Sequence, residues 1–321
     1  MEIFSLTLSQ MLMMFTLILV GLFLRKKNIL PENAGSVMAK METYIFVPAL
    51  TLFTQMTRCT VQTFTDNSSL ILYGLVLVLS AVALAYPLST LFVRKISSPA
   101  DAYQRNIYKY AMTFGNYGFM GNFIILGIWG PDMLYKYSLF CIFVGIVCTG
   151  WGLFILIPRQ ENSNMGTALK KAFLSPPMLS MIIGIACGLL GLKQYIPEFL
   201  LSVFENAGNC QGPVAMVLAG FVVGGYHLKE LLLNKKVYIA TAMRLIAIPS
   251  VMMVVLRLLG TSEEIMLLTL ICFASPLGLN TIVYPATYGG DTKTGASMAC
   301  ISHTLSVITI PLMYLIFIVL L

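Results

Sequence analysis

Long apolar runs constrain the fold of this chain more than any other feature. They are about 20 residues long and lack the alternation of a barrel strand, so they predict membrane-spanning helices. The chain is 58% hydrophobic and only 10% charged, whereas a soluble domain usually carries about 25% charged residues. We therefore expect an all-α integral membrane protein with ten spans, at residues 6–24, 34–54, 70–93, 106–127, 134–157, 175–192, 199–224, 236–256, 264–287 and 295–320.

The distribution of basic residues predicts the orientation. Loops after odd-numbered spans hold fourteen Lys and Arg residues, and loops after even-numbered spans hold four. Because basic residues are retained on the cytoplasmic side, both termini should lie outside the cytoplasm. The formal charge of +7 then reflects membrane topology, and no nucleic-acid partner is expected. The first span precedes Arg25-Lys26-Lys27, the reverse of a secretory signal, so we expect it to be retained.

Chemistry-bearing motifs are few. The seven cysteines include no C-x-x-C pair, and six fall inside predicted spans, so neither a disulfide framework nor a zinc site is indicated. The spans contain no H-E-x-x-H, paired acids or serine-histidine arrangement. We expect no catalytic residues, no metal and no cofactor, and hence not an enzyme.

An internal repeat divides the chain into two sets of five spans. The two halves carry matching proline and glycine residues. In the first half Leu30-Pro31 is followed by Val47-Pro48, and in the second half Ile196-Pro197 is followed at a similar distance by Gly212-Pro213. Likewise, Gly118 precedes Gly130 by the same distance as Gly278 precedes Gly290. Because five crossings are an odd number, the second set enters from the opposite face, and the repeat is inverted. The predicted units are residues 1–158, a short cytoplasmic linker at 159–174, and residues 175–321.

Spans four and nine each contain a cluster that breaks a helix. These are "FGNYGFMGN", Phe114 to Asn122, and "ASPLGLNT", Ala274 to Thr281. In a bilayer an unpaired backbone group costs several kcal/mol, so such breaks survive only beside protein or a water-filled cavity. Two corresponding breaks indicate a transporter site near the midplane, with half-helix N-termini that favour an anion.

Each predicted site residue also has a simpler interpretation. We expect the substrate to contact Asn116, Tyr117, Gly118, Ser275, Pro276, Gly278, Asn280 and Thr281, and we expect hinges or gates at Pro48, Gly115, Gly121 and Pro213. The alternative is that these glycines serve helix packing and that the prolines are simple kinks. Ionisable residues inside spans predict a proton site or charge pair, and these are Glu42, Glu205, Arg244 and His303. The alternatives are snorkelling for the two glutamates and a packing role for His303. A pairing of Arg244 with Glu42 or Glu205 stays open.

The whole chain resembles the auxin efflux carrier family, whose superfamily includes the bile acid sodium symporters. The resemblance is carried by Phe46-Val47-Pro48-Ala49-Leu50, by residues 115–121, and by the run from Tyr288-Gly289-Gly290-Asp291 to Ile310-Pro311. It implies two inverted five-helix repeats in which broken helices four and nine cross. By position, Asn116 and Gly118 match the first crossover, and Pro276, Gly278 and Asn280 match the second. We expect Gly118 to lie where the chains cross.

The resemblance implies a secondary carrier of small organic anions, such as malate, malonate or auxin-like carboxylates, that works by alternating access in the cell membrane. Alternatives are a sodium-coupled symporter of the bile acid type and a membrane sensor. Unlike the sodium symporters, Ala274 to Thr281 contains no acid, so sodium coupling is not expected. The short loop from Pro158 to Leu174 resembles bacterial rather than plant members. The expected partners are the anion and the lipid bilayer, and a homodimer stays open.

Overall fold

The structure is a computed structural model that describes residues 2–156, 165–282, 285 and 291–320. These residues form helices, with one isolated antiparallel bridge and no strand in this part of the chain. The all-α class predicted from the apolar runs is confirmed. The predicted motif at Tyr288-Gly289-Gly290 lies outside the described residues.

The first half of the chain supplies twelve of the described elements. They are α1 (Glu2–Lys26), α2 (Ala34–Met41), η1 (Glu42–Phe46), α3 (Val47–Arg58), α4 (Val61–Asn67), α5 (Ser69–Thr90), α6 (Pro99–Thr113), η2 (Tyr117–Gly121), α7 (Asn122–Phe140), α8 (Ile142–Val147), η3 (Cys148–Gly152) and α9 (Leu153–Leu156).

The second half supplies another twelve. They are α10 (Met165–Phe173), α11 (Pro176–Leu189), η4 (Leu192–Tyr195), α12 (Glu198–Asn209), α13 (Gln211–Gly224), α14 (Leu228–Leu232), α15 (Lys235–Ala242), η5 (Met243–Ala247), α16 (Ile248–Leu258), α17 (Glu263–Phe273), α19 (Lys293–Tyr314) and η6 (Leu315–Leu320). Element η4 is a 3-10 turn, and the other η elements are π-helical.

Several helices are suited to crossing a membrane. Five described stretches are long and apolar enough, and the number rises to seven if each of two bent helix pairs forms one span. The pairs bend by 52° between Phe140 and Ile142 and by 51° between Phe173 and Pro176. The protein is therefore a multi-pass membrane protein. The expected spans 106–127 and 264–287 are interrupted where α6 and α17 end.

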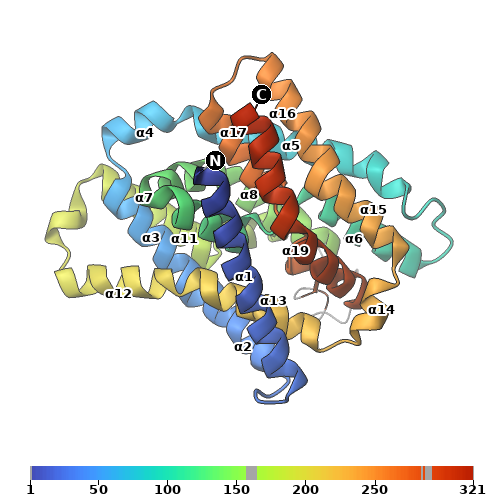
Figure 1. Cartoon of the computed structure of the whole chain (residues 1–321). Helices are drawn as coiled ribbons and strands as arrows, with labels where there is room; N and C mark the ends of the chain where they lie inside the picture. The colour runs from blue at the N-terminus through green and yellow to red at the C-terminus, as the bar shows by residue number, and fades with distance from the viewer. Residues whose placement is uncertain (1, 157–164, 283–284, 286–290, 321) are drawn as a thin grey trace.

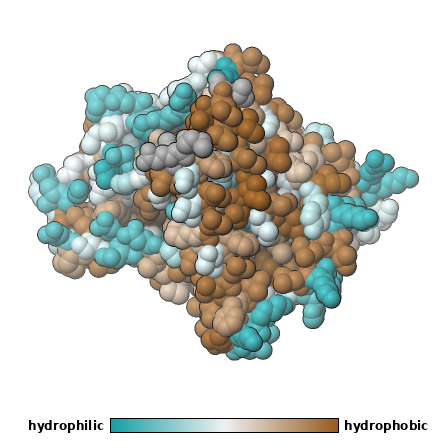
Figure 2. Space-filling view, viewed as in Figure 1, coloured by the Kyte–Doolittle hydropathy of each residue, from teal (hydrophilic) through white to brown (hydrophobic). Residues whose placement is uncertain are grey.

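Apolar side chains cover the surface where lipid would lie. Figure 2 shows a broad hydrophobic area over α1 and α19, with hydrophilic side chains gathered towards the edges of the molecule. Exposed apolar residues on these two helices include Leu12 and Leu19 on α1 and Ile308 and Leu312 on α19. The two termini lie at the same end of the molecule (Figure 1).

Glycine allows the helices α1 and α13 to pack closely. A Cβ at Gly21 would overlap the Val217 carbonyl oxygen, and one at Gly220 would overlap that of Ile18. Small residues that bring backbones together are the usual means of helix association in a bilayer. Gly21 and Gly220 therefore serve the close packing of α1 against α13.

Local signals explain where the two broken helices begin and end. The helix α6 starts at a capping box in which Ser98 and Asp101 bond each other's backbone, and Ser262 caps α17 by accepting from the Ile265 amide. The chain turns extended at Phe114 after α6, and Ala274 follows α17 one residue before Ser275-Pro276. Both helices therefore stop inside the molecule.

Part of the predicted linker is ordered helix. Residues 165–173 form α10, which packs against η3 and reaches the central cavity described below. The apolar positions of this short segment allow one face to pack while its lysines stay exposed. Residues 159–164 of the predicted linker lie outside the described part of the chain.

Candidate functional site

The two helix breaks meet inside the protein. Gly115 and Leu277 form an antiparallel bridge, and the Asn116 amide donates to the Pro276 carbonyl over 2.7 Å. The Leu277 amide in turn donates to Ser302 Oγ over 2.9 Å. Each break thus pairs backbone groups that the other leaves open, as an irregular segment at membrane depth requires.

This close contact depends on Gly115. A Cβ on Gly115 would lie 2.5 Å from the Ser275 carbonyl oxygen and 3.0 Å from that of Pro276. In the second break, a Cβ on Gly278 would lie 3.3 Å from the Gly115 carbonyl oxygen. By contrast, a Cβ on Gly118 would have nothing within 4 Å. The expectation that Gly118 lies where the chains cross is wrong, because its open side faces the cavity and Gly115 occupies the crossing.

Arg244 joins the ends of the two interrupted helices from behind the crossing. Its side chain is only 1% exposed, and its Nη1 and Nη2 atoms lie 3.4 Å from the Met112 and Cys272 carbonyl oxygens. These carbonyls belong to the last turns of α6 and α17, where helices leave acceptors unpaired and carry partial negative charge. The guanidinium also lies 5.4 Å from the Phe273 ring centre.

The two glutamates that were left open as partners of Arg244 lie elsewhere. Neither forms an ion pair among the described residues. Glu205 is exposed and lines a separate cavity with Arg58 and Lys193. Glu42 is 0% exposed at the start of η1, and both carboxyl oxygens have no hydrogen-bond partner. Backbone carbonyls therefore replace the acidic partner considered for Arg244.

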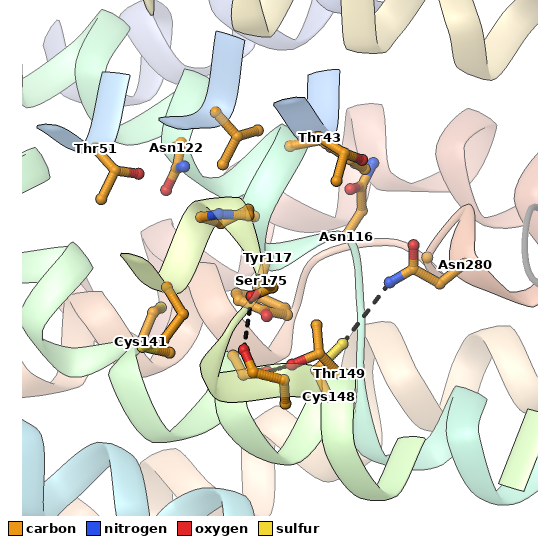
Figure 3. Close-up of a pocket in the computed structure, with 18 of the residues that line it drawn as sticks. Thr43, Thr51, Asn116, Tyr117, Asn122, Cys141, Cys148, Thr149, Ser175 and Asn280 are labelled. Atoms are coloured by element: carbon orange, nitrogen blue, oxygen red, sulfur yellow. Dashed lines mark hydrogen bonds between the residues drawn. The ribbon is translucent and has the colours of Figure 1, made fainter. Parts of the chain in front are cut away.

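A cavity of about 320 Å³ opens beside the crossing. Both breaks line it, the first through residues 115–119 and the second through residues 278–280, and α2, η1 and α3 face it through Ala39, Thr43, Val47 and Thr51. Figure 3 shows the labelled polar side chains around this space, among them Asn116 and Asn280. Two asparagines from opposite halves of the chain thus reach one cavity.

Both asparagines are held by protein contacts. Asn116 Nδ2 lies 3.3 Å from His303 Nε2 on α19. Asn280 Nδ2 donates to Tyr110 Oη over 2.8 Å and approaches Cys148 Sγ at 3.7 Å, a contact visible in Figure 3. Because Nδ2 carries two hydrogens, Asn116 keeps a second donor besides its contact with His303, whereas Asn280 directs its two hydrogens at Tyr110 Oη and Cys148 Sγ.

Other predicted contact residues divide between the cavity and its supporting wall. Tyr117, Gly118 and Gly278 line the cavity with the asparagines. Ser275 and Thr281 are buried, and their hydroxyls donate to the Ile271 and Gly278 carbonyl oxygens, so they support the break and do not line the cavity. Pro276 supplies its carbonyl to Asn116 and likewise does not line the cavity.

The predicted hinge residues lie near the cavity but do not line it, apart from Gly115. Pro48 lies in the first turn of α3, directly after η1, and Pro213 lies in the first turn of α13. A Cβ on Gly121 would overlap Tyr137 Oη, which donates to the Tyr117 carbonyl over 3.0 Å. Gly121 therefore serves close packing behind η2, and hinge motion at the prolines stays a prediction.

Sequence reasoning missed the hydroxyl groups of the cavity and its one cation. The cavity is also lined by Thr43, Thr51, Ser138, Thr149, Ser175 and Lys171. The spacing of Ala39, Thr43, Val47 and Thr51 places four residues on one helix face, and it is the pattern that could have identified this wall. Lys171 is exposed on α10 and is the only charged residue among the described ones that line the cavity.

Metal ligands do not cluster in the described part of the chain. No group of three or more His, Cys, Asp or Glu side chains is placed there to hold an ion. All seven cysteines are free thiols. Among the described residues, the groups that line the cavity are amides, hydroxyls, the thiols of Cys141 and Cys148, a backbone helix start and the ammonium group of Lys171.

Comparison with known proteins adds two findings. A family model described as membrane transport protein matches residues 6–314. An uncharacterized transporter of Methanocaldococcus jannaschii is 25% identical over 310 residues, which cover 94% of this chain and 96% of that protein. Both matches extend across the two breaks and all the helices that line the cavity.

Proposed function

Since the chain belongs to the membrane transport protein family of auxin efflux carriers, we propose that it is a secondary carrier of small organic anions. One observation carries this proposal: Asn116 and Asn280, from two breaks in opposite halves of the chain, line the same cavity. The substrate class is carboxylates of the size of malate or malonate, or auxin-like acids. Alternating access to this cavity is the mechanism.

Charge and backbone geometry favour an anion. Lys171 supplies positive charge where α10 reaches the cavity, and no acidic side chain is among the described residues that line it. The helix that starts at Tyr117 begins at the cavity, and its Met120 and Gly121 amides bond the Asn116 carbonyl oxygen. The earlier amides of such a first turn point out of the helix start, which is a favourable place for a carboxylate.

The cavity also fits the proposed substrate in size and polarity. Its volume of about 320 Å³ is at the small end of the range for ligand pockets, which is roughly 300–1,000 Å³. Most of its wall is apolar, and its polar groups include Asn116, Asn280, Asn122 and several hydroxyls. A small carboxylate would pair its charged end with the amides and place its carbon chain against the apolar wall.

We extend the proposal to the membrane arrangement. Residues 1–158 and 175–321 form two inverted five-helix repeats that give ten spans, with both termini outside the cytoplasm of the cell that carries the protein. The bridge between Gly115 and Leu277 supports this proposal, because matched segments of the two repeats meet there. Lys171 then marks the cytoplasmic mouth of the cavity.

The experiment compares Asn116→Ala with a matched control, Asn206→Ala. Asn206 is exposed on α12, away from the cavity. Removing a charge-assisted bond worth roughly 1.5–3 kcal/mol should weaken malate binding about tenfold or more. Binding and uptake of radiolabelled malate are measured in proteoliposomes, together with the melting temperature of each variant.

The control variant should bind malate like the unmodified protein. If Asn116→Ala lowered only the melting temperature and left affinity unchanged, Asn116 would be a structural residue, and the proposed site would be wrong. Failure of the unmodified protein to carry malate, malonate and indole acetate would contradict the proposed substrate class.

A further inference from the structure

The contact between His303 and Asn116 fixes which ring nitrogen carries a hydrogen. His303 is 4% exposed, and its Nδ1 atom lies 2.8 Å from the Ala299 carbonyl oxygen. A carbonyl oxygen can only accept, so Nδ1 is the donor. In the neutral ring Nε2 is then an acceptor, and Asn116 Nδ2, 3.3 Å away, donates to it. The histidine thus presents a lone pair to a residue that lines the cavity.

A proton added to this ring would reverse the contact. Both ring nitrogens of the cation are donors, so Nε2 and Asn116 Nδ2 would face each other as two donors. A half-turn of the Asn116 amide removes the conflict, because its Oδ1 then accepts from Nε2–H. The same half-turn releases both Nδ2 hydrogens, and a cation now lies directly behind them. Each change favours a carboxylate in the cavity.

We propose that His303 is the proton-coupling residue of this carrier, so that one proton binds at His303 Nε2 with each anion and leaves with it on the opposite side. This inference rests on the proposed carrier function and adds the coupling ion to it. One N–H bond forms at Nε2 when a hydronium ion gives up its proton and leaves as water, and the same bond breaks when water on the opposite side takes the proton. A dianion such as malate then moves with one net negative charge.

Charged groups on the elements packed against α19 are engaged elsewhere. On η5, Arg244 bonds the carbonyl oxygens at the crossing. On α14, Glu230 pairs with Lys293 at the start of α19 over 2.6 Å, and on α17, Glu264 pairs with Lys136. Three other titratable groups on these elements and on α19 are buried or half-buried: the thiols Cys272 and Cys300 and the phenol Tyr314. Apart from His303 itself, all remaining charged or titratable groups on these elements, and on α15, α1 and α19, lie near helix ends or on exposed faces.

The buried carboxyl group of Glu42 makes no comparable contact with a residue of the cavity. Neither Glu42 nor His303 lines the cavity itself, but the Glu42 carboxyl oxygens contact no polar partner in the structure, whereas His303 contacts Asn116, which does line it. Arg244 lies close behind the bridge, but a guanidinium does not lose its proton in proteins. His303 is therefore the titratable group whose protonation changes a hydrogen bond of a cavity residue, Asn116.

The first test observes the ring directly. The variant His227→Gln removes the exposed second histidine and leaves His303 alone. Nitrogen-15 spectra of its histidine-labelled full chain should show the neutral ring with hydrogen on Nδ1 in the absence of anion. Saturating malate should convert the signal to the doubly protonated ring. A ring that stays neutral with malate bound would overturn the proposal.

The second test measures coupling in proteoliposomes with the membrane potential clamped. An inward proton gradient should drive malate accumulation by the unmodified protein and by His227→Gln, approaching about tenfold for each pH unit at equilibrium. His303→Gln keeps an amide in place of the ring but cannot bind the proton. It should bind malate more weakly than the unmodified protein, and the malate exchange that it retains should show no accumulation driven by the proton gradient.

The outcomes separate the two proposals. Accumulation by His303→Gln equal to that of the unmodified protein would refute coupling at His303 and leave the carrier function standing. Malate exchange by the unmodified protein without any response to the proton gradient would do the same. If the unmodified protein exchanged none of malate, malonate and indole acetate, the carrier proposal would fail, and the coupling proposal with it. Should His303→Gln not fold, the spectrum of the His227→Gln protein still decides.

Discussion

Replacing Gly115 or Gly118 by alanine should have opposite consequences. In Gly115→Ala the new Cβ would lie 2.5 Å from the Ser275 carbonyl oxygen, so the two backbones would have to separate by about 1 Å to reach an ordinary contact. That shift breaks the 2.7 Å bond between the Asn116 amide and the Pro276 carbonyl. Overpacking costs about 1–3 kcal/mol, and an unpaired buried amide costs about 1–3 kcal/mol. Because the same backbone shift relieves the overlap and breaks the bond, we expect the free energy of unfolding to fall by about 2–4 kcal/mol.

In Gly118→Ala the added methyl group meets nothing within 4 Å, and it projects into the cavity. Stability should therefore stay unchanged, while malate binds more weakly because the methyl group takes part of its space. Melting temperatures in detergent should fall by about 3–6 °C for Gly115→Ala and stay constant for Gly118→Ala. Equal melting temperatures for the two variants would refute the assignment of Gly115 to the crossing.

Three further predictions concern charge, topology and coupling. Arg244→Met leaves the Met112 and Cys272 carbonyl oxygens unpaired and should destabilise the protein by about 2–4 kcal/mol in denaturant titrations; a smaller loss than that of an exposed substitution would contradict the capping role. A Ser5→Cys variant in which the exposed Cys210 is replaced by serine should react with an impermeant thiol reagent on intact cells, and reaction only after lysis would reverse the proposed orientation. A sodium gradient should leave initial malate uptake unchanged, because no acid is among the described cavity residues; stimulation by sodium but not potassium would overturn this.

The sequence predicted the two breaks because glycine, proline and asparagine inside an apolar run cannot continue a helix without compensation. It also predicted that Asn116 and Asn280 face one cavity, since they belong to the two breaks that the predicted repeat matches. Their common cavity follows from that reasoning. The walls that supply Thr43 and Thr51 were missed, because hydroxyl residues in a membrane helix commonly bond their own backbone and carry no distinct signal.

Backbone contacts were harder to predict than side-chain chemistry. Arg244 was considered as half of an ion pair, because a buried cation is normally expected beside an acid. Its actual partners are carbonyl oxygens of two helix ends, which every residue possesses and no sequence pattern marks. For the same reason Gly115 and Gly118 could not be told apart: the difference depends on which one faces the opposite backbone. Ser275 and Thr281 have suitable chemistry, yet their hydroxyls turn towards their own chain.

The bridge between Gly115 and Leu277 also governs how the protein can be made. The first break leaves the ribosome well before the second one exists, so the Asn116 amide has no Pro276 carbonyl to bond during that interval. A backbone group left open in lipid costs several kcal/mol, and the first half of the chain therefore cannot complete its structure alone. Assembly therefore depends on the crossing. A chain truncated before Ala274 retains an unpaired Asn116 amide, and only the second half of the chain supplies its acceptor.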